Sequence, residues 1–369
     1  MKNYVLDLSC IDSSASGAKQ RILSIYREMI ANYKNVKFTL IYTDFKDIKK
    51  EFNFPNVNFK KNPFSQSNLI LKILSVFYVY FYLTYSDKKF DVVEHFTLPF
   101  IKIRGSINVV TIHDLRKIFF SNFFLTNIFF RIVYKIFLSS VDKIIVVSFS
   151  AKKELMQYFK FKNIIVSYNV ITENYKKKIK QDYLIKIKKK YKLPKRFLIS
   201  VGHLEKRKNF VNLIKAIKIL KENKLNLNLI IIGQKSDETE NIFNEIKNLK
   251  LSSNVRIFSN LNNDEVLCFY SLADIFIYPS LYEGFGIPML ESMASKLPIV
   301  LSNTQVFREI TKNKYFYFDP NDPLSIANKI KFVFSDMFIR QNMVNYGQKR
   351  IKIFNPSVQA KKIYSNVIS

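Results

Sequence analysis

Two glutamates eight positions apart have the spacing that most plainly indicates chemistry in this chain. Glu283 stands before a glycine-containing loop, and Glu291 follows it. Gly284 and Gly286 allow a tight loop whose backbone N–H groups can approach a ligand closely. Pro288 fits an early position of the helix predicted next, where its missing N–H costs nothing. The loop amides and the helix N-terminus would bind anions or hydroxyls, and the two carboxylates can accept paired hydrogen bonds from the diols of a ribose or hexose.

A second group of candidates lies in residues 200–209. Gly202 follows a predicted strand and can turn the chain, so His203, Arg207 and Lys208 should project near the carboxyl edge of a sheet. Cations at such an edge can stabilise the charge that develops on a departing diphosphate. A solvated surface is the alternative interpretation for each of these three side chains.

Two further candidates lie in the first half of the chain. His113 follows the apolar run 109–112, where it can hydrogen-bond a sugar hydroxyl; a structural histidine is the alternative. Gly17 lies between a predicted strand at 4–8 and a predicted helix at 19–33, a position where such folds cradle phosphate. Both positions follow the carboxyl end of a predicted strand, where α/β sheets bind their ligands.

These segments resemble glycosyltransferase family 4, a family of retaining enzymes with the GT-B fold. The resemblance rests on the Glu-x7-Glu spacing within residues 283–291, together with residues 273–280 and 200–209. It is specific from residue 197 to the C-terminus, roughly half of the chain. The weaker upstream matches are Ser16-Gly17, His113-Asp114 and Val147-Ser148.

The resemblance implies transfer of a sugar from a nucleotide-diphosphate sugar, with retention at the anomeric carbon and with no metal or other cofactor. It assigns Lys208 to the leaving diphosphate, Glu291 to the ribose hydroxyls, and Glu283 with the glycine loop to the sugar. It places His113 by the donor sugar, so Glu283, Lys208 and His113 are the predicted catalytic residues. The predicted donor-binding residues are Gly17, His203, Arg207, Arg256, Ile257, Gly284, Phe285, Gly286, Ile287 and Glu291.

Three details qualify this assignment. Many relatives carry Arg where His203 stands, which leaves the second cation beside Lys208 open; Arg207 is a candidate to supply it. Residues 255–258 resemble the segment that holds the base, largely through backbone groups, so their side chains do not identify the base. Residues 354–356 resemble the point where the last helix crosses back to the first domain.

The elements that must position these residues form an alternating pattern. Continuous apolar runs are separated by helical stretches, which is typical of parallel sheets covered on both faces. We therefore predict an α/β protein of the GT-B fold, with two Rossmann-like doubly wound domains facing across a cleft. The predicted parts are an acceptor-binding domain at 1–175, a lysine-rich linker region at 176–196, a donor-binding domain at 197–351, and a C-terminal helix at about 352–369 that returns to the first domain.

The composition limits the choice of function. The chain has 369 residues, 59 Lys plus Arg against 29 Asp plus Glu, and a net charge of +30. An AT-rich genome explains much of the lysine excess, and the small share of Arg argues against a nucleic-acid reader. Two cysteines fit a reduced, intracellular setting. The sequence contains no Asp-x-Asp, GxGxxG, Walker A or G-x-S-x-G motif and no zinc-ligand spacing.

Two apolar stretches could meet a membrane. Residues 69–85 are short for a spanning helix, and we predict a core helix there. Residues 119–138 are dense in Phe and carry cations, so they form either a plain core helix or a surface that touches a membrane interface. No signal peptide is expected. We predict a cytoplasmic protein, with a peripheral site on the inner membrane's cytoplasmic face as the further possibility.

The predicted function is therefore hexosyl transfer from a nucleotide sugar to a saccharide acceptor in bacterial surface polysaccharide or lipopolysaccharide synthesis. The aromatic and basic stretch favours a lipid-linked acceptor and an anionic membrane surface as partners. A sugar-nucleotide epimerase of the same fold is the alternative enzyme, and it would need no acceptor. A basic, non-catalytic nucleic-acid-binding protein is the alternative from another class, and it would bind polynucleotides in a salt-sensitive way.

Overall fold

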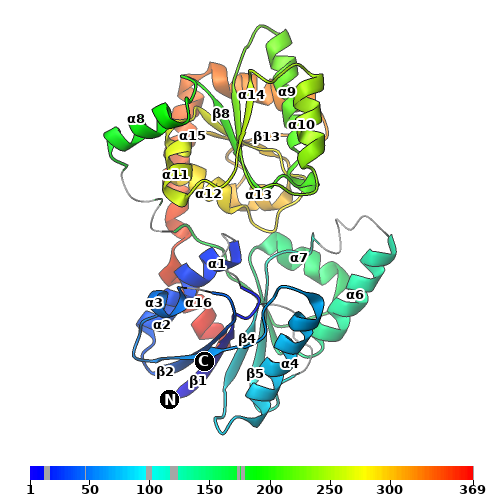
Figure 1. Ribbon diagram of the computed structural model, residues 1–369, viewed down its shortest axis with the longest axis vertical. Helices are drawn as coiled ribbons and strands as arrows, with labels where there is room; N and C mark the ends of the chain where they lie inside the picture. Colours follow the sequence, from blue (N-terminus) through cyan, green and yellow to red (C-terminus); the bar gives the residue numbers. More distant parts are fainter. Residues whose placement is uncertain are drawn as a thin grey trace. The chain divides into compact units, whose positions relative to one another are not determined.

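The computed structural model describes residues 1–11, 17–45, 47–96, 102–116, 124–172, 175 and 179–368, without the side chains of 124–127. The chain divides into two compact units: Met1–Val170 with Phe354–Ser369, and Ile171–Ile353. Each unit contains one parallel sheet, as predicted (Figure 1). The lysine-rich segment predicted as a linker contains helix α8 (Gln181–Lys190) and belongs to the second unit.

The N-terminal unit is built on a seven-stranded sheet with the order β3-β2-β1-β4-β5-β6-β7. Neighbouring residues of β1 point to opposite faces of this sheet: Tyr4 and Leu6 join one hydrophobic core, and Val5 joins another. The strands are β1 (Lys2–Asp7), β2 (Val36–Tyr42), β3 (Val57–Lys61), β4 (Val92–His95), β5 (Ile107–Ile112), β6 (Lys143–Val146) and β7 (Ile164–Val166).

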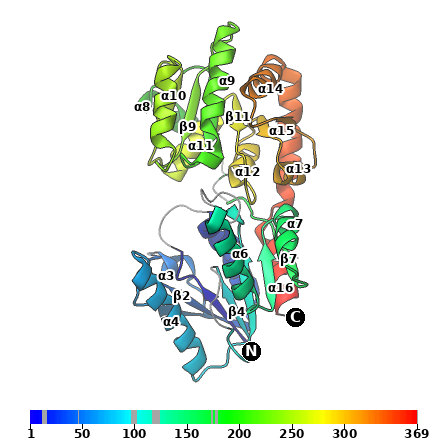
Figure 2. The same ribbon diagram turned by 90° about the vertical axis from the view of Figure 1, so that its right-hand side faces the viewer.

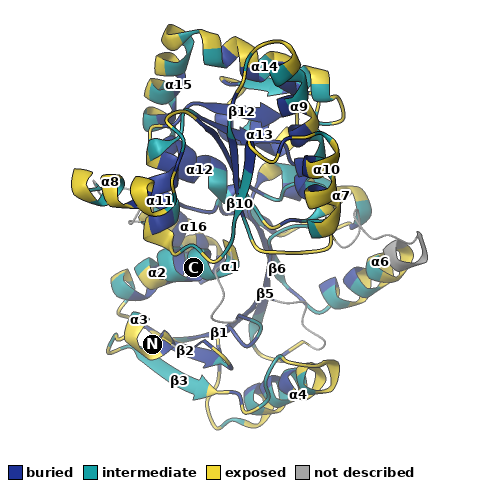
Figure 3. Cartoon of the chain, turned by 45° about the horizontal axis from the view of Figure 1, so that its top comes forward, coloured by how far each residue is buried: buried dark blue, intermediate teal, exposed yellow. Residues whose placement is uncertain are grey.

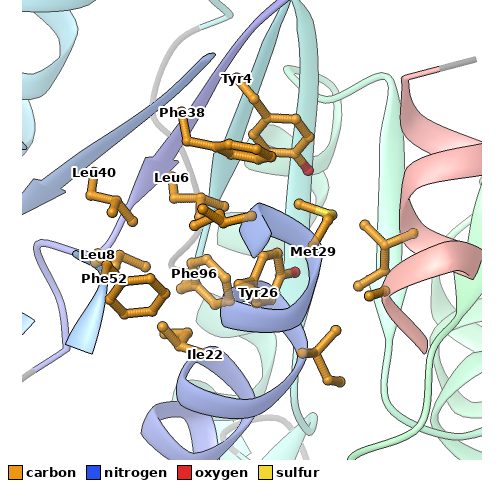
Figure 4. Close-up of a cluster of buried hydrophobic side chains, with 14 of the residues drawn as sticks. Tyr4, Leu6, Leu8, Ile22, Tyr26, Met29, Phe38, Leu40, Phe52 and Phe96 are labelled. Carbon is orange, nitrogen blue, oxygen red and sulfur yellow. The ribbon is translucent and has the colours of Figure 1, made fainter. Parts of the chain in front are cut away.

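Helices cover both faces of this sheet. The helical stretch predicted at 19–33 is present as α1 (Gly17–Arg21), the π-helical turn η1 (Ile22–Tyr26) and α2 (Arg27–Asn32). Tyr26 and Met29 of this stretch enter the larger core (Figure 4). The other helices are α3 (Ile48–Glu51), α4 (Leu69–Tyr85), α6 (Phe124–Leu138), α7 (Phe149–Tyr158) and the C-terminal α16 (Pro356–Val367).

The last helix packs in the N-terminal unit, as the resemblance implied. Helix α16 contacts α2 and η1 (Figure 1). The ring of Tyr364 stacks on that of Tyr33 with centroids 3.6 Å apart. The backbone N–H of Tyr168 donates to the side-chain oxygen of Gln359 at 2.9 Å. The end of the chain therefore completes the core of the first unit.

Helix α4 differs in part from its prediction as a core helix. Ser75, Val79 and Leu83 are buried, but Phe77 and Phe81 on another side are 50% and 53% exposed. Exposed and buried residues accordingly alternate along α4 (Figure 3). The prediction is right about the helix and wrong about its outer face. No helix in the described part of the chain is long and apolar enough to cross a membrane.

The second unit contains a six-stranded parallel sheet with the order β10-β9-β8-β11-β12-β13. Its strands are β8 (Leu198–Val201), β9 (Leu229–Ile232), β10 (Val255–Phe258), β11 (Ile275–Tyr278), β12 (Ile299–Ser302) and β13 (Phe316–Phe318). Helix α9 packs against α10 and α14, and α12 packs against α11 and α15 (Figure 2). The helical elements besides α8 are η3 (Lys206–Lys208), α9 (Phe210–Glu222), α10 (Thr239–Asn248), α11 (Asn263–Leu272), α12 (Ile287–Ala294), α13 (Gln305–Thr311), α14 (Pro323–Ser335), α15 (Met337–Arg350) and η4 (Ile351–Ile353).

Candidate active site

The loop between β11 and α12 is held in a conformation that requires glycine. Gly286 has a φ of +98°, a backbone conformation that other residues rarely adopt. A Cβ atom on Gly286 would lie 2.9 Å from Cε1 of Phe307. Pro288 follows in the first turn of α12, where no N–H is needed. The sequence therefore fixes a sharp turn directly after Glu283.

Two cations and a hydroxyl group contact the carboxylate of Glu283. Its Oε1 atom lies 2.6 Å from Nζ of Lys208 and 3.1 Å from Nη1 of Arg207. The hydroxyl of Ser280 donates to the same oxygen at 2.8 Å. The ammonium of Lys208 also donates to the phenol oxygen of Tyr278 at 3.2 Å. Arg207 and Lys208 thus contact the same carboxylate oxygen.

These contacts set the ionisation of Glu283. Burial alone would raise the pKa of its carboxyl group, but Lys208 and Arg207 outweigh burial and lower that pKa to about 2. Burial lowers the pKa of Lys208, Arg207 adds to this effect, and Glu283 opposes it. Glu283 is therefore an anion at neutral pH, enclosed by positive charge.

Backbone packing at the carboxyl ends of β8 and β9 positions Lys208. A Cβ atom on Gly202 would lie 2.9 Å from Cε of Lys208, so the lysine stem lies directly against this glycine. A Cβ atom on Gly233 would lie 1.8 Å from the carbonyl oxygen of Gly202, so the two backbones approach closely there. Asn209 follows with a φ of +58°, and its side chain donates to the carbonyl of Pro279 at 3.1 Å. Glycines and a left-handed Asn thus bring the β8 turn to the β11 turn.

Glu291 lies in a separate, phenol-lined environment. Its side chain is buried, and the hydroxyl of Tyr270 in α11 donates to Oε2 at 3.1 Å. Burial raises the pKa of Tyr270, and the charge of Glu291 raises it further. Burial and Glu291 act in the same way on the pKa of Tyr175. Glu283 and Glu291 therefore differ in partners: the first is paired with cations, and the second with neutral phenols.

The remaining predicted residues of the second unit fall into two groups. Phe285 is buried and Ile287 is half-buried within the loop turn, whereas His203 is exposed. The guanidinium of Arg256 donates to the carbonyls of Lys192 and Tyr191 at 2.8 and 2.7 Å. The side chain of Arg256 thus anchors the segment after α8, while Ile257 continues strand β10.

The N-terminal unit contributes His113 and Gly17. His113 follows β5, is half-buried, and its Nε2 atom has no hydrogen-bond partner among the described residues. Burial and the charge of Arg21 lower the pKa of His113 to about 3, so the ring is neutral near pH 7. Gly17 begins α1 and is exposed, and Ser14 to Ser16 of the predicted phosphate cradle lie outside the described residues.

Several site residues were missed by the sequence analysis. Tyr278 and Ser280 lie next to the Glu283 loop, but the sequence pattern identifies them only as strand and loop positions. Tyr175 and Tyr270 lie far from Glu291 in the sequence, so no local pattern connects them with it. For Gly233 the sequence did give one indication of a position near the site, because this glycine directly follows a predicted apolar strand. Within the described ranges, no group of three or more His, Cys, Asp or Glu residues is placed to hold a metal ion.

The sequence of this chain is similar to those of known glycosyltransferases. The family model "Glycosyl transferases group 1" matches residues 184–350. The chain is 28% identical over 265 residues to the O-antigen chain mannosyltransferase RfbU of Salmonella typhimurium, covering 69% of this chain and 70% of that protein. It is 26% identical over 222 residues to the O-antigen chain mannosyltransferase B of Escherichia coli, covering 59% and 58%.

Solved structures share the fold at low sequence identity. The complex of Anabaena Alr3699/HepE with UDP-glucose superposes with a TM-score of 0.78 at 16% identity and covers 99% of both chains. WaaG, a glycosyltransferase involved in lipopolysaccharide biosynthesis, superposes with a TM-score of 0.72 at 13% identity and covers 99% of this chain and 100% of its own. Together, the fold and the relatives make this chain a glycosyltransferase of the GT-B fold, similar to enzymes of bacterial surface polysaccharide synthesis.

Proposed function

We propose that this glycosyltransferase is a retaining hexosyltransferase of family 4 that uses a nucleotide-diphosphate sugar. The observation that carries the proposal is the cluster in which Lys208 and Arg207 enclose Glu283 beside a glycine-dependent loop. Its acceptor is a saccharide of a bacterial surface polysaccharide or lipopolysaccharide, the context for which several relatives are named.

The two cations act on the leaving group. When the donor breaks down, negative charge develops on the diphosphate, and fixed cations stabilise that charge best when they are already in place. The contacts with Glu283, Tyr278 and Gly202 fix Lys208 before any ligand arrives. Arg207 is held by Glu205 at 2.6 Å. We assign Lys208 and Arg207 to the leaving diphosphate.

The two glutamates hold hydroxyl groups of the donor. Glu283, with the amides of residues 284–286, binds the sugar, and Glu291 binds the ribose. Glu283 is a poor nucleophile because its Oε1 is engaged by Lys208, Arg207 and Ser280. This supports a same-face mechanism, in which the departing phosphate oxygen takes the acceptor's proton and the anomeric configuration is retained. In the N-terminal unit, His113 and Gly17 are the proposed donor-binding residues, and Nε2 of His113 has no hydrogen-bond partner among the described residues.

We further propose that transfer needs no metal ion or other cofactor. Lys208 and Arg207 supply the positive charge that a divalent cation would otherwise provide. Transfer should continue in excess EDTA at the untreated rate. A rate that falls with EDTA and returns with Mg²⁺ or Mn²⁺ would contradict metal independence.

Nucleotide binding tests the donor site directly. We expect one of UDP, GDP, ADP, CMP or dTDP to raise the melting temperature, because a ligand at 100 times its Kd stabilises by about 2.7 kcal/mol. Glu291→Gln should weaken that shift, since a neutral amide accepts ribose hydrogen bonds less strongly. Glu240→Gln, an exposed change in α10, is the matched control and should keep the full shift. An undiminished shift in Glu291→Gln would remove Glu291 from the donor site.

The donor sugar and the reaction type need product analysis. Relatives named as mannosyltransferases favour a mannosyl donor, whereas a neighbouring structure holds UDP-glucose, so GDP- and UDP-sugars should both be offered. An α-linked product from an α-linked donor supports retention, and a β-linked product contradicts it. An isomerised nucleotide sugar without any acceptor product would instead identify the epimerase alternative.

The acceptor is proposed to be lipid-linked and reached from the cytoplasmic face of the inner membrane. Helix α6 exposes Phe129, Ile132 and Ile136 together with the cations Arg131 and Lys135. Helix α4 exposes Phe77, Phe81 and Tyr85, and it contains no acidic residue. Exposed aromatic and aliphatic side chains with interspersed cations suit an anionic membrane interface. Peripheral membrane attachment through these two faces is part of the proposal.

A further inference from the structure

In the described part of the chain, several buried polar atoms without hydrogen-bond partners lie at the carboxyl edge of the N-terminal sheet. Among the described residues, seven buried side-chain nitrogen and oxygen atoms lack a hydrogen bond, and six belong to the N-terminal unit. These six atoms belong to five residues: four residues end a strand or directly follow one, and the fifth is the buried Arg21 of α1, which contributes two atoms. The four are Thr43 after β2, His95 at the end of β4, His113 after β5 and Ser167 after β7.

Such atoms need an explanation, because leaving a buried polar group unpaired destabilises the folded state. Native structures keep few of them, and those that persist commonly mark a bound water, an ion or a functional group. Their collection at the edge where α/β sheets bind ligands points to a ligand with several hydroxyl groups.

One of these residues is held in a defined orientation by a carboxylate. Asp7 and His95 end the neighbouring strands β1 and β4 and lie opposite each other in register. Nδ1 of His95 lies 2.9 Å from Oδ2 of Asp7, and both side chains are buried. The backbone N–H of Ser9 donates to the other oxygen of Asp7 at 3.2 Å. Asp7 is thus fixed from two sides and in turn fixes the imidazole ring.

This pairing decides which ring nitrogen is available. Burial would raise the pKa of Asp7, but the hydrogen bonds and charge of His95 and the bonds from Ser9 lower it, so Asp7 is ionised and accepts a hydrogen from Nδ1. Because Nδ1 is engaged by Asp7, Nε2 is the ring nitrogen left to bond a hydroxyl group: it accepts when the ring is neutral and donates when the ring is protonated. It has no donor within the described residues. A carboxylate that orients an imidazole in this way is a common arrangement wherever a histidine binds or activates a hydroxyl.

We propose that the Asp7–His95 pair binds a hydroxyl group of the acceptor saccharide, through Nε2 of His95. The inference rests on the proposed function, because a glycosyltransferase must hold a polyhydroxylated acceptor as well as its donor. The hydroxyl of Thr43, which follows the strand on the other side of β1, is a second unpaired group at the same edge. Asp7 is a positioning residue, and His95 is the acceptor-binding residue.

Two substitutions of His95 separate binding from structure. His95→Asn keeps an amide near the position of Nδ1, where it can still pair with Asp7, and removes the atom at Nε2. His95→Gln reaches the Nε2 position and can accept a hydroxyl hydrogen there. With p-nitrophenyl hexosides as acceptors, we expect His95→Asn to raise the acceptor KM at least tenfold and His95→Gln to recover part of that loss. Both variants should keep the donor KM and the nucleotide-induced melting shift of the wild type.

Asp7→Asn and a matched control complete the experiment. Asp7→Asn should also raise the acceptor KM, as His95→Asn does, because a neutral amide no longer fixes the tautomer of His95. Asp142→Asn makes the same change just before β6, at the opposite edge of the same sheet, where Asp142 accepts from the backbone N–H of Asn108 at 2.8 Å. This control should leave the acceptor KM unchanged. A purely structural Asp7–His95 pair would instead lower kcat and stability in Asp7→Asn and His95→Asn, without a selective change in acceptor KM.

A measurement on the wild type covers the case in which a variant fails to fold. The ¹⁵N resonance of His95 Nε2 should shift when a p-nitrophenyl hexoside binds. An acceptor KM in His95→Asn within threefold of the wild type, or an Nε2 resonance that no hexoside moves, would overturn the proposal. Failure of the proposed function looks different, since the wild type would then show no melting shift with any nucleotide.

Discussion

The charge of Glu283 depends on its neighbours. Its carboxylate would be costly to bury alone, and it is stable as an anion because Lys208 and Arg207 lie within 2.6 and 3.1 Å. In the proposed donor site the same cations contact the diphosphate, so both ligand binding and protein stability depend on them. Removal of one partner should therefore affect both properties.

The low pKa of Glu283 predicts a pH dependence of stability. The folded-state pKa is about 2 and the ordinary value is 4.5, so the unfolded chain takes up the proton first as the pH falls. The stabilisation is fully present above about pH 4.5 and is lost as the pH falls towards 2. Its magnitude is on the order of 3 kcal/mol. Urea unfolding of Glu283→Gln between pH 5.5 and 3 should show a weaker decline than the wild type.

A matched variant separates this effect from general acid unfolding. Glu222 is an exposed acid at the end of α9, 3.1 Å from Lys218. Exposed pairs contribute little to stability, so Glu222→Gln should decline with pH as the wild type does. Parallel curves for the wild type and Glu283→Gln would contradict the assigned pKa.

At the scale of elements, turns that only glycine can form bring the site together. β8, β9 and β11 end at one edge of the second sheet, and their following turns carry Gly202, Gly233 and the loop with Gly286. The chain can make these turns because no side chain occupies the space that Lys208, the Gly202 backbone and Phe307 fill. The cation cluster is therefore a consequence of backbone packing.

Gly286→Ala tests this dependence. The added methyl group meets Phe307 at 2.9 Å and the backbone keeps a φ of +98°, so the free energy of unfolding should fall by about 2–4 kcal/mol from strain and overpacking together. Gly105→Ala is the matched control: its φ is +78°, but nothing lies within 4 Å of its added Cβ. It should cost about 1 kcal/mol. Equal losses in the two variants, measured by urea unfolding, would show that packing against Phe307 has no role.

For the whole molecule, charge and exposed apolar area act together. The net charge of +30 favours anionic surfaces generally, but salt screens it within about 10 Å at 0.1 M. The apolar faces of α4 and α6 add a short-range attraction that salt does not remove. Membrane attachment built on both terms should weaken with salt without disappearing.

Vesicle sedimentation tests this combination. The wild type should bind vesicles containing anionic phospholipid more tightly than purely zwitterionic vesicles. The double variant Phe77→Glu, Phe81→Glu should lose about tenfold or more in apparent affinity, because each change removes apolar area and adds repulsion. Phe243→Glu, which changes an exposed Phe of α10 in the second unit, is the matched control and should bind nearly as the wild type. If the variants at α4 and α10 bind equally well, the α4 face has no special role.

The sequence by itself determined the fold class and most of the elements. Long apolar runs predict central strands, because a strand buried on both faces must be apolar throughout. The strands that it missed, β3, β7 and β13, all lie at sheet edges, where one side is open and the apolar pattern is short. The outer face of α4 was misjudged for a related reason: a helix that is apolar all round reads as buried, whether or not something covers it.

The sequence also located the segments that form the cation cluster, because Glu283, Gly286 and Lys208 lie in short local patterns. Only the tertiary structure decided which side chains meet. It placed Arg207 on Glu283, paired Glu291 with Tyr270 and Tyr175, and brought Asp7 to His95 across 88 residues of chain. Such pairs cannot be predicted from a local pattern. Strand order and register decide which residues meet, and the amino-acid pattern of either segment alone does not contain that information.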